Sequence, residues 1–230
     1  MRPSRLFHPT RMREVSFIRR WLRARPGGRV CDIGCGDGYY SLRMAEGREL
    51  YGFDPWAGQV KQAAHLAATR RARALFLTAD ARSMPYANGS FDAVLSLCVL
   101  EHVPEVERAF HEANRLLKPG GSFLFTVDSL SEPHVPQSYR AYHRERFYIA
   151  EFLDVGRVRT LLSENGFEIV QWDSVIRNRV SGAIFRLFAL RYATYRWFSP
   201  VLSLACWVAD LFWGSHDRGY CLLFAARKLG

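Results

Sequence analysis

Short apolar runs alternate with longer amphipathic stretches through the first half of this chain. The runs are rich in valine, leucine, isoleucine and phenylalanine, and they lie at 29–33, 49–53, 75–78, 91–96 and 122–127. Stretches with helical spacing or alanine-rich composition separate several of them, at 39–46, 57–69 and 105–117. Because strands that alternate with helices form parallel sheets covered on both faces, the pattern predicts an α/β fold.

A separate helical segment is predicted over residues 1–28, ahead of the first strand. Apolar positions between Thr10 and Arg25 recur near the helical period, and Pro26 with the two glycines that follow it ends the helix. The segment is rich in arginine but has no apolar core of signal-peptide length, so no signal peptide is expected. We interpret it as an N-terminal lid.

The second half of the chain departs from simple alternation. Residues 129–146 are polar and are expected to form a long loop, and a helix is expected over 150–164. Apolar runs at 167–172 and 220–225 predict two last strands, which complete a seven-stranded, mostly parallel sheet. Residues 173–216, which lead into the last strand, are expected to form a helical insertion.

Length and composition predict a single domain over residues 1–230. The chain has 230 residues, of which 49% are hydrophobic, enough for a sizeable core. The formal net charge is +10, which suits acidic substrates, nucleic acid or anionic membranes, although a general bias towards arginine would also produce it. The 5 cysteines form no C-x-x-C pair. They predict buried, reduced thiols in a cytoplasmic protein, with no metal site.

A glycine-rich turn follows the first predicted strand. Asp32 is followed by glycine at every second position, at Gly34, Gly36 and Gly38, and a helix-like stretch comes next. Glycine has no Cβ to hold a ligand away, so the backbone N–H groups of such a turn can approach a ligand closely. The order of strand, glycine turn and helix therefore predicts a ligand-binding turn.

This turn resembles the nucleotide-binding turn, D/E-x-G-x-G-x-G, of class I S-adenosylmethionine (SAM) methyltransferases. The resemblance implies a Rossmann-like fold with SAM as cofactor. It also implies a set of cofactor-binding residues in the turn, namely Asp32, Gly34, Cys35, Gly36 and Gly38. The glycine spacing differs from the G-x-G-x-x-G of nicotinamide dehydrogenases, which makes that class a weaker match.

Two further acidic residues stand at predicted strand ends. Asp54 follows the second strand, where a carboxylate can accept hydrogen bonds from both ribose hydroxyls of a nucleoside; the alternative is an Asp-Pro turn. Asp80 follows the third strand. The resemblance implies that Asp80 receives the adenine amino group and that the N–H of Ala81 meets the ring. The alternative for Asp80 is a helix cap or a turn.

The fourth predicted strand opens a longer block of similarity. Residues 91–103, FDAVLSLCVLEHV, resemble the matching segment of small-molecule methyltransferases such as the quinone-biosynthesis O- and C-methyltransferases. In that family the end of this strand lines the methionine part of SAM, which implies that role for Leu97. Residues 116–121 match the family's turn before the fifth strand. The resemblance spans about residues 10–172 and the last strand, and it specifies cofactor and fold better than substrate.

Histidines are the candidate catalytic residues. A neutral His102 beside the methyl group could take a proton from an attacking hydroxyl. Alternatively, Glu101 and His102 cap or pack the next helix, and positioning alone serves methyl transfer. His134 and His143 are further acceptor-site candidates. In relatives an N-terminal arginine or aromatic residue folds over the methionine carboxylate, which makes Arg11 a candidate cofactor-binding residue, with a solvated surface position as the alternative.

The helical insertion is dense in aromatic residues between positions 175 and 213. Two helices are expected there, broken at Ser199-Pro200, and the longest charge-free run, 197–209, is too short to span a bilayer. Three interpretations stay open. The insertion is an ordinary cover on the sheet, a lid over an apolar acceptor, or a peripheral membrane contact with its arginines at the lipid headgroups.

The leading hypothesis is SAM-dependent methyl transfer to a small, apolar or aromatic organic acceptor. An RNA or DNA methyltransferase would suit the charge, but residues 96–99 read Ser-Leu-Cys-Val in place of an N/D-P-P-Y/F block, which argues against nucleic acid as a partner. A third hypothesis is a catalytically silent scaffold that binds a partner or a membrane surface through residues 175–213. The fold alone determines neither the acceptor nor the methylated atom.

Overall fold

The computed structural model describes residues 8, 10–25, 27–190, 196–212 and 214–230. A seven-stranded sheet runs through this part of the chain in the order β3-β2-β1-β4-β5-β7-β6. The strands are β1 (Arg29–Ile33), β2 (Glu49–Asp54), β3 (Ala74–Thr78), β4 (Phe91–Leu97), β5 (Leu117–Asp128), β6 (Phe167–Val175) and β7 (Cys221–Lys228). Neighbouring strands are parallel except at β7, which is antiparallel to β5 and β6. The predicted Rossmann-like, mostly parallel sheet is confirmed.

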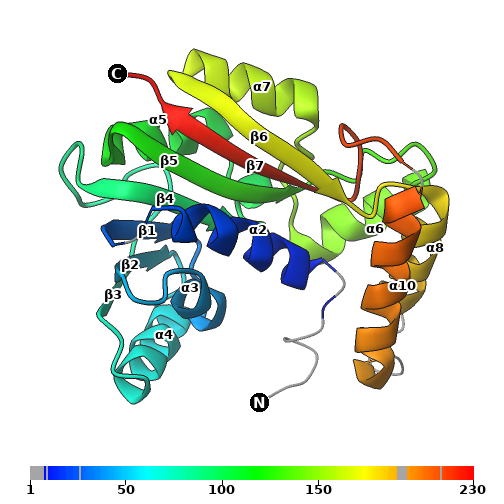
Figure 1. Ribbon diagram of the computed structural model, residues 1–230, viewed down its shortest axis with the longest axis horizontal. Coiled ribbons are helices and arrows are strands. Elements are labelled where there is room, and N and C mark those ends of the chain that lie inside the picture. Colours follow the sequence, from blue (N-terminus) through cyan, green and yellow to red (C-terminus); the bar gives the residue numbers. More distant parts are fainter. Residues whose placement is uncertain (1–7, 9, 26, 191–195, 213) are drawn as a thin grey trace.

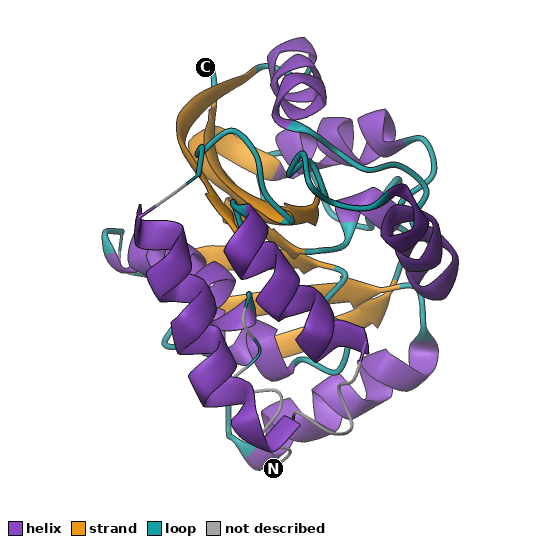
Figure 2. Cartoon of the chain, turned by 90° about the vertical axis from the view of Figure 1, so that its right-hand side faces the viewer, coloured by secondary structure: helices purple, strands orange, loops and turns teal. Residues whose placement is uncertain are grey.

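Helices cover both faces of the sheet (Figure 1 and Figure 2). One face packs against α2 (Arg11–Arg23), α3 (Tyr39–Met44) and α4 (Ala57–Thr69). The other face packs against α5 (Val106–Leu116) and α7 (Val155–Glu164). Each face has its own apolar core, with Ile18 of α2 in one and Phe110 of α5 in the other, both fully buried. Burying one such side chain stabilises the fold by about 1.5–3 kcal/mol.

The carboxyl ends of the parallel strands lie together at one edge of the sheet. β6 ends at this edge and β7 begins there, because Val175 pairs with Cys221. The chain between them forms the helical insertion, which consists of α8 (Arg179–Leu190), η2 (Arg196–Phe198) and α10 (Ser199–Phe212). α8 and α10 lie side by side at the end of the sheet (Figure 1). The helix α10 begins at the predicted break, Ser199-Pro200, where proline fits the first turn of a helix.

The long loop predicted over residues 129–146 is wrong in its second part. Residues Gln137–Phe147 form a helix, α6, which follows Pro136. Its buried side chains, Tyr139 and His143, are four residues apart and therefore share one face. The helix was missed because these buried positions are polar aromatic residues, while the apolar spacing that signals a helix is weak.

Other element boundaries also differ from the prediction. The helix expected over 150–164 starts only at Val155, because the side chain of Asp154 caps it by accepting a hydrogen bond from the N–H of Arg157 at 2.8 Å. β5 starts at Leu117, before the expected turn, and the stretch around Pro119 and Gly121 forms an irregularity in its pairing with β4. Neither of these differences moves a strand end at the carboxyl edge, whereas β6, expected to end at residue 172, continues to Val175 there.

The N-terminal segment, expected to be a lid over residues 1–28, is described from Thr10 to Arg25 and at His8. Its helix α2 packs its apolar stripe on the sheet, with Val15, Ile18 and Leu22 buried. Residues 1–7, 9 and 26 of the expected lid lie outside the described residues. Among the helices described, none combines the length and the hydropathy needed to cross a membrane.

Candidate active site

Two cavities open at the carboxyl edge of the sheet, and they share His102 and Phe147. The first is bordered by the glycine turn after β1 and by the ends of β2 and β3, and we call it the cofactor pocket. The second is bordered by the ends of β4 and β5, by α6 and α8, and by the start of β7, and we call it the acceptor cavity. Ligands of open α/β sheets bind at this edge, where strand order reverses.

The glycine turn is held by backbone hydrogen bonds to the end of β2. The N–H groups of Gly34 and Cys35 both donate to the carbonyl of Phe53, at 2.7 and 2.8 Å. The next N–H along the turn, that of Gly36, donates to Oδ2 of Asp54 at 2.9 Å. Because β2 fixes the turn through three donors, the turn has one defined shape, and Asp54 is oriented at the same time.

The three glycines of the turn differ in the space that a side chain would find. All three adopt left-handed backbone angles, with φ of +74° at Gly34, +53° at Gly36 and +73° at Gly38. A Cβ on Gly34 would lie 2.3 Å from Val99 Cγ2, and one on Gly38 would lie 2.9 Å from Ala63 Cβ. A Cβ on Gly36 would meet nothing within 4 Å. Gly34 and Gly38 therefore allow close packing, whereas Gly36 leaves open space.

Asp54 is well placed to present a carboxylate to a nucleoside. It is buried at the end of β2, where Oδ2 accepts from Gly36 and Oδ1 accepts from the N–H of Trp56 at 3.0 Å. Each carboxylate oxygen has a second lone pair for a further donor. The geometry thus gives the predicted ribose-binding carboxylate a fixed orientation beside the cofactor pocket.

The cofactor pocket itself has a volume of about 370 Å³ and mostly apolar walls. Ala81 lines it, and so does the exposed ring of Trp56. Asp80 also lines it, but both of its carboxylate oxygens are held by Arg82, with Oδ1 accepting from the backbone N–H at 2.8 Å. The hydrogen bond to the Arg82 side chain lowers the pKa of Asp80. An adenine amino group bound at this point would donate to a carboxylate that already accepts hydrogen bonds from Arg82.

Asp32 lies beneath the glycine turn and lines neither of these two cavities. Its side chain is buried, and within the described chain its Oδ1 has no hydrogen-bond partner. Burial raises the pKa of Asp32 to about 7, and the charge of Asp54 acts in the same direction. The sequence placed Asp32 among the cofactor-binding residues, whereas the structure buries it in β1 outside both cavities.

The remaining predicted cofactor residues lie along the same edge. Leu97 is half-buried at the end of β4, and Cys35 is buried in the turn with its thiol facing the carbonyl of Gly36 at 3.7 Å. Arg11 stands in the first turn of α2 and borders the acceptor cavity. Its NH1 donates to Oε2 of Glu14 at 2.6 Å, so the predicted carboxylate-binding guanidinium already holds one carboxylate.

The acceptor cavity has a volume of about 380 Å³, which suits a small organic molecule. Aromatic side chains dominate its walls, and they come from α6, α8 and the start of β7: Tyr139, Tyr142, Phe147, Phe185, Phe188 and Tyr220. Its polar lining comes from His8, Arg11, His102, Asp128, His143 and Arg146. The cavity therefore combines an apolar, aromatic enclosure with a cluster of titratable groups.

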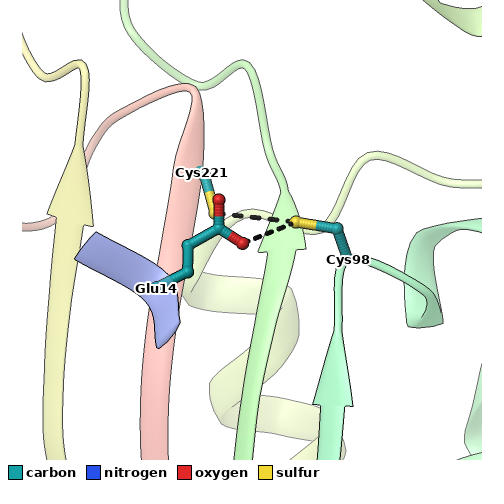
Figure 3. A group of neighbouring side chains, drawn as sticks. All are labelled: Glu14, Cys98 and Cys221. Carbon is teal, nitrogen blue, oxygen red and sulfur yellow. Dashed lines mark hydrogen bonds between the residues drawn. The ribbon is translucent and has the colours of Figure 1, made fainter. Parts of the chain in front are cut away.

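A buried cluster of one carboxyl group and two thiols lies where α2 meets the sheet (Figure 3). Glu14 of α2 is fully buried, and its Oε2 accepts from Thr126 at 3.0 Å and from the Cys98 thiol at 3.2 Å. The Cys98 and Cys221 sulfur atoms are 3.9 Å apart. Burial raises the pKa of Cys221 to about 12 and holds that of Cys98 well above its usual value, so both are thiols near neutral pH.

Asp128, at the end of β5, was missed from the sequence. Its Oδ2 is 3.1 Å from Nε2 of His143, and its backbone N–H donates to Oε1 of the fully buried Glu101 at 2.9 Å. Burial opposes ionisation of Asp128, but the hydrogen bond with His143 and the charge of Arg11 outweigh it and lower its pKa. The available signal was its place directly after a strand, which also pointed to Asp54 and Asp80.

The three candidate histidines have different positions. His102, in the turn η1 (Leu100–His102), borders both cavities, and its Nε2 lies 4.0 Å from Oε1 of Glu101. His143 lines the acceptor cavity and pairs with Asp128, as described above. His134 does not line the acceptor cavity. It is exposed, and its Nδ1 lies 2.7 Å from Oε1 of Glu132. The structure therefore brings His102 and His143 to the site and leaves His134 outside it.

Comparison with known proteins gives a family match for the central part of the chain. Residues 31–125 match the model of the methyltransferase domain. The 27-O-demethylrifamycin SV methyltransferase of Amycolatopsis mediterranei is 38% identical over 104 residues, which is 44% of this chain and 38% of that protein. The chain spans well under half the length of several curated relatives that it matches.

Solved structures with the same architecture cover nearly all of the chain. The cyclase SpnF superimposes with a TM-score of 0.70 at 27% identity, covering 95% of this chain and 81% of that one. Phosphoethanolamine N-methyltransferase 2 of Haemonchus contortus, in complex with S-adenosyl-L-methionine, has a TM-score of 0.69 at 21% identity and covers 95% of this chain and 53% of that one. With the family match over residues 31–125, the fold and the glycine turn, these similarities support a class I SAM-dependent methyltransferase.

Proposed function

We propose that this protein transfers the methyl group of SAM to a small organic acceptor with an aromatic or apolar body, held in the acceptor cavity. One observation carries the proposal. A pocket beside the glycine turn and a separate aromatic cavity meet at a single titratable side chain, that of His102. Such an arrangement lets a cofactor and an acceptor occupy different sites with their reactive ends adjacent.

The residues at the cofactor pocket fit SAM. Gly36 leaves open space where a side chain would stand, Asp54 offers an oriented carboxylate for a ribose, and Ala81 borders an apolar pocket that suits a flat ring. When bound, SAM supplies a methyl group on a positively charged sulfur that leaves readily. The half-buried Leu97 is a proposed neighbour of its methionine part, and Arg11 is proposed to reach the methionine carboxylate from the side of the acceptor cavity, which it borders.

The chain's own contribution to the reaction is to orient the acceptor and accept its proton. The aromatic walls exclude water and hold the acceptor body, and alignment of the attacking atom with the methyl group supplies much of the rate. We propose His102 as the group that takes the proton, because it borders both cavities. The pair of Asp128 and His143 would then orient a polar group of the acceptor at the far side.

The aromatic enclosure favours phenols and other hydroxylated ring compounds over open-chain polar acceptors. Tyr139, Phe185 and Tyr220 offer ring faces and edges for stacking with a planar acceptor. Burial raises the pKa of both tyrosines, so they stay neutral and can donate hydrogen bonds at neutral pH. The enclosed cavity of small-molecule size argues further against a polynucleotide as the acceptor.

The proposal is tested by incubating the protein with methyl-labelled SAM and a panel of phenolic, quinone-derived, amine and lipid acceptors, with products read by mass spectrometry. The expected result is a labelled product from an aromatic hydroxyl compound, reduced when Tyr139 is replaced by alanine. SAM binding together with aromatic-acceptor binding, but without transfer, would contradict methyl transfer and favour another reaction on this fold. SpnF, a structural neighbour named as a cyclase, shows that the fold accommodates other activities.

A further inference from the structure

The helical insertion exposes an unusual amount of apolar surface. More than half of the large hydrophobic side chains that are exposed in the described chain lie in α8, η2 and α10. Along α10 they recur at Val201, Leu204, Val208 and Leu211, a spacing of three or four residues that places them on one face. Val201 is 65% exposed and Leu211 is 59% exposed. Contiguous exposed apolar surface of this kind marks an interaction site.

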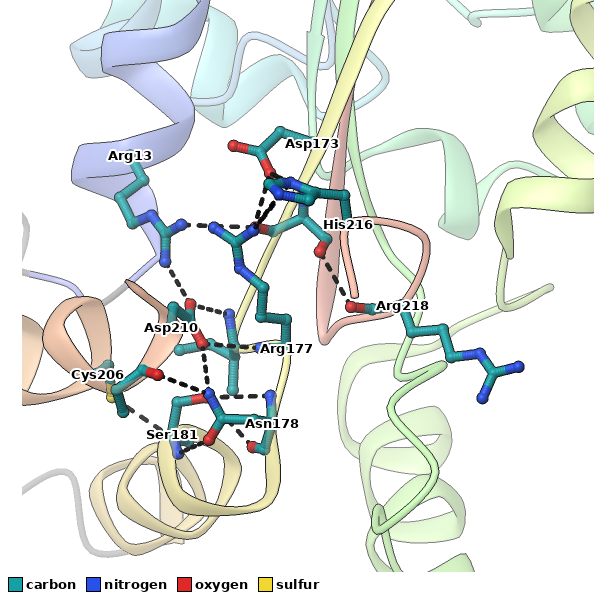
Figure 4. A network of polar contacts seen from close by, with 12 residues as sticks. Arg13, Asp173, Arg177, Asn178, Ser181, Cys206, Asp210, His216 and Arg218 are labelled. Carbon is teal, nitrogen blue, oxygen red and sulfur yellow. Dashed lines mark hydrogen bonds and ion pairs between the residues drawn. The ribbon is translucent and has the colours of Figure 1, made fainter. Parts of the chain in front are cut away.

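The opposite face of α10 is already occupied by the rest of the protein. Cys206, Ala209 and Asp210 are buried there against α8 and the end of β6. Asp210 accepts hydrogen bonds from the backbone N–H groups of Ile176 and Arg177, at 2.8 and 3.0 Å (Figure 4). The insertion is therefore fixed to the sheet through its inner face, and the exposed stripe is not needed to hold it in place.

A salt bridge reinforces this attachment. The NH1 group of Arg13, in α2, lies 2.5 Å from Oδ2 of Asp210, whose side chain is fully buried (Figure 4). The Nδ2 group of Asn178 donates to Oδ1 of Asp210 at 3.3 Å and to the carbonyl of Ala209 at 3.0 Å. Because Asp210 joins α2, the end of β6 and α10, the outer face keeps one orientation relative to the acceptor cavity.

The charges of the insertion are almost all positive. Asp210 is the sole acidic residue between positions 175 and 213, and it is buried and paired, whereas the same stretch has five arginines, at 177, 179, 186, 191 and 196. Arg179 is exposed at the start of α8. The whole chain has a formal charge of +10. An apolar face without exposed acidic groups, on a basic protein, is complementary to an anionic lipid surface.

We infer that the outer face of the insertion docks on an anionic lipid bilayer, with α10 lying in the plane of the membrane interface. We call this surface the docking face and define it by Val180, Leu187, Val201, Leu204, Trp207 and Leu211. The helix lies on the membrane and does not span it, in keeping with its length. Trp207, half-exposed on the same helix, is a side chain suited to the headgroup region.

The docking face and the acceptor cavity are formed in part by the same helix, α8. Leu187 of α8 faces outward, while Phe185 and Phe188 of the same helix line the acceptor cavity. A docked insertion therefore brings the acceptor cavity close to the lipid surface, where apolar acceptors concentrate. This consequence rests on the proposed function, whereas the docking itself does not depend on an acceptor or on methyl transfer.

Vesicle sedimentation tests the inference directly. The full chain is mixed with vesicles of phosphatidylcholine alone and with vesicles that also contain phosphatidylglycerol, at low and at physiological salt. We expect binding to the anionic vesicles, weakened by salt, and a blue shift of tryptophan fluorescence on binding. The double variant Leu204→Glu with Leu211→Glu should lose at least tenfold in vesicle affinity, because it puts two negative charges on the docking face.

A matched control distinguishes an effect at the docking face from the general effect of adding two negative charges. The double variant Leu75→Glu with Val170→Glu makes the same change at exposed leucine and valine side chains on β3 and β6, which are 47% and 41% exposed. It should keep wild-type vesicle binding. Both double variants should bind SAM as the wild type does, which shows that they are folded and keeps this test separate from that of the proposed function.

Three outcomes would overturn the inference. The wild type does not sediment with anionic vesicles even at low salt, or the control variant loses as much binding as the docking-face variant. In the third outcome, the wild type is a dimer by light scattering, the docking-face variant is a monomer, and neither binds vesicles. A second copy of the chain, and not lipid, would then cover this face. A milder pair, Leu204→Ser with Leu211→Ser, serves the same comparison if the glutamate pair does not fold.

Discussion

The cofactor pocket and the acceptor cavity are built in contrasting ways. The glycine turn and Asp54 are fixed by hydrogen bonds that backbone N–H groups of the turn donate to the Phe53 carbonyl and the Asp54 carboxylate at the end of β2. The acceptor cavity is walled by side chains from α2, β5, α6, α8 and β7, which come from distant parts of the chain. A backbone site tolerates little change, whereas a site of side chains on variable helices can be altered one position at a time. The contrast explains how one fold keeps one cofactor and serves many acceptors.

The largest effect is expected at the attachment of the insertion. Asp210→Ala leaves Arg13 and two backbone N–H groups without their buried acceptor, which should cost about 3–5 kcal/mol of unfolding free energy. Because Asp210 lines neither of the two cavities, we expect the folded fraction to bind SAM normally. The measurements are denaturant unfolding and SAM titration. Asp217→Ala, at an exposed acceptor for Trp172, is the control, and equal losses in the two variants would contradict the account.

A smaller but sharper effect is expected within the glycine turn. Gly34→Ala places a Cβ 2.3 Å from Val99 Cγ2 at a left-handed φ, so we expect a loss of about 3 kcal/mol in unfolding free energy. Gly36→Ala has the same backbone strain but no clash, so its loss should be about 1 kcal/mol, with SAM affinity falling instead. An unchanged SAM affinity for Gly36→Ala would show that SAM does not occupy the open space at Gly36.

The cofactor pocket and the acceptor cavity also differ in how far the sequence predicts them. The glycine turn, Asp54 and Asp80 follow strands at fixed spacing, so their common edge followed from local patterns. The acceptor cavity could not be predicted in the same way, because Tyr139 and His143 belong to a helix whose buried face is polar, and the pairing of Asp128 with His143 depends on that helix. The pairing of Asp80 with Arg82 likewise depends on side-chain directions that spacing does not give.

The proton-accepting role of His102 gives the next prediction. His102→Ala should lower kcat by about 100-fold, equivalent to about 2.7 kcal/mol, while the Kd for SAM stays unchanged. The matched control is His134→Ala, since His134 is exposed beside Glu132 and does not line the acceptor cavity. Steady-state rates with an identified acceptor provide the readout. An unchanged kcat for His102→Ala would assign the rate to positioning alone.

The smallest effect concerns the pH dependence of stability through Asp32. Its pKa is raised from 3.8 to about 7 in the folded protein by burial. Between these pH values the folded state keeps a proton that the unfolded state has lost, so stability falls as pH rises, by up to about 1.4 kcal/mol per pH unit. Asp32→Asn should flatten this slope in urea unfolding at pH 5 and pH 7. A slope equal to that of the wild type would show that Asp32 is ionised throughout.

The most direct test of the two-site account is a calorimetric SAM titration of the wild type and two variants. Asp54→Ala removes the oriented carboxylate beside the cofactor pocket, and Tyr139→Leu changes the wall of the acceptor cavity. The account predicts micromolar binding by the wild type, at least tenfold weaker binding by Asp54→Ala, and unchanged binding by Tyr139→Leu. A folded wild type that does not bind SAM, or equal losses in the two variants, would contradict the assignment of separate cofactor and acceptor sites.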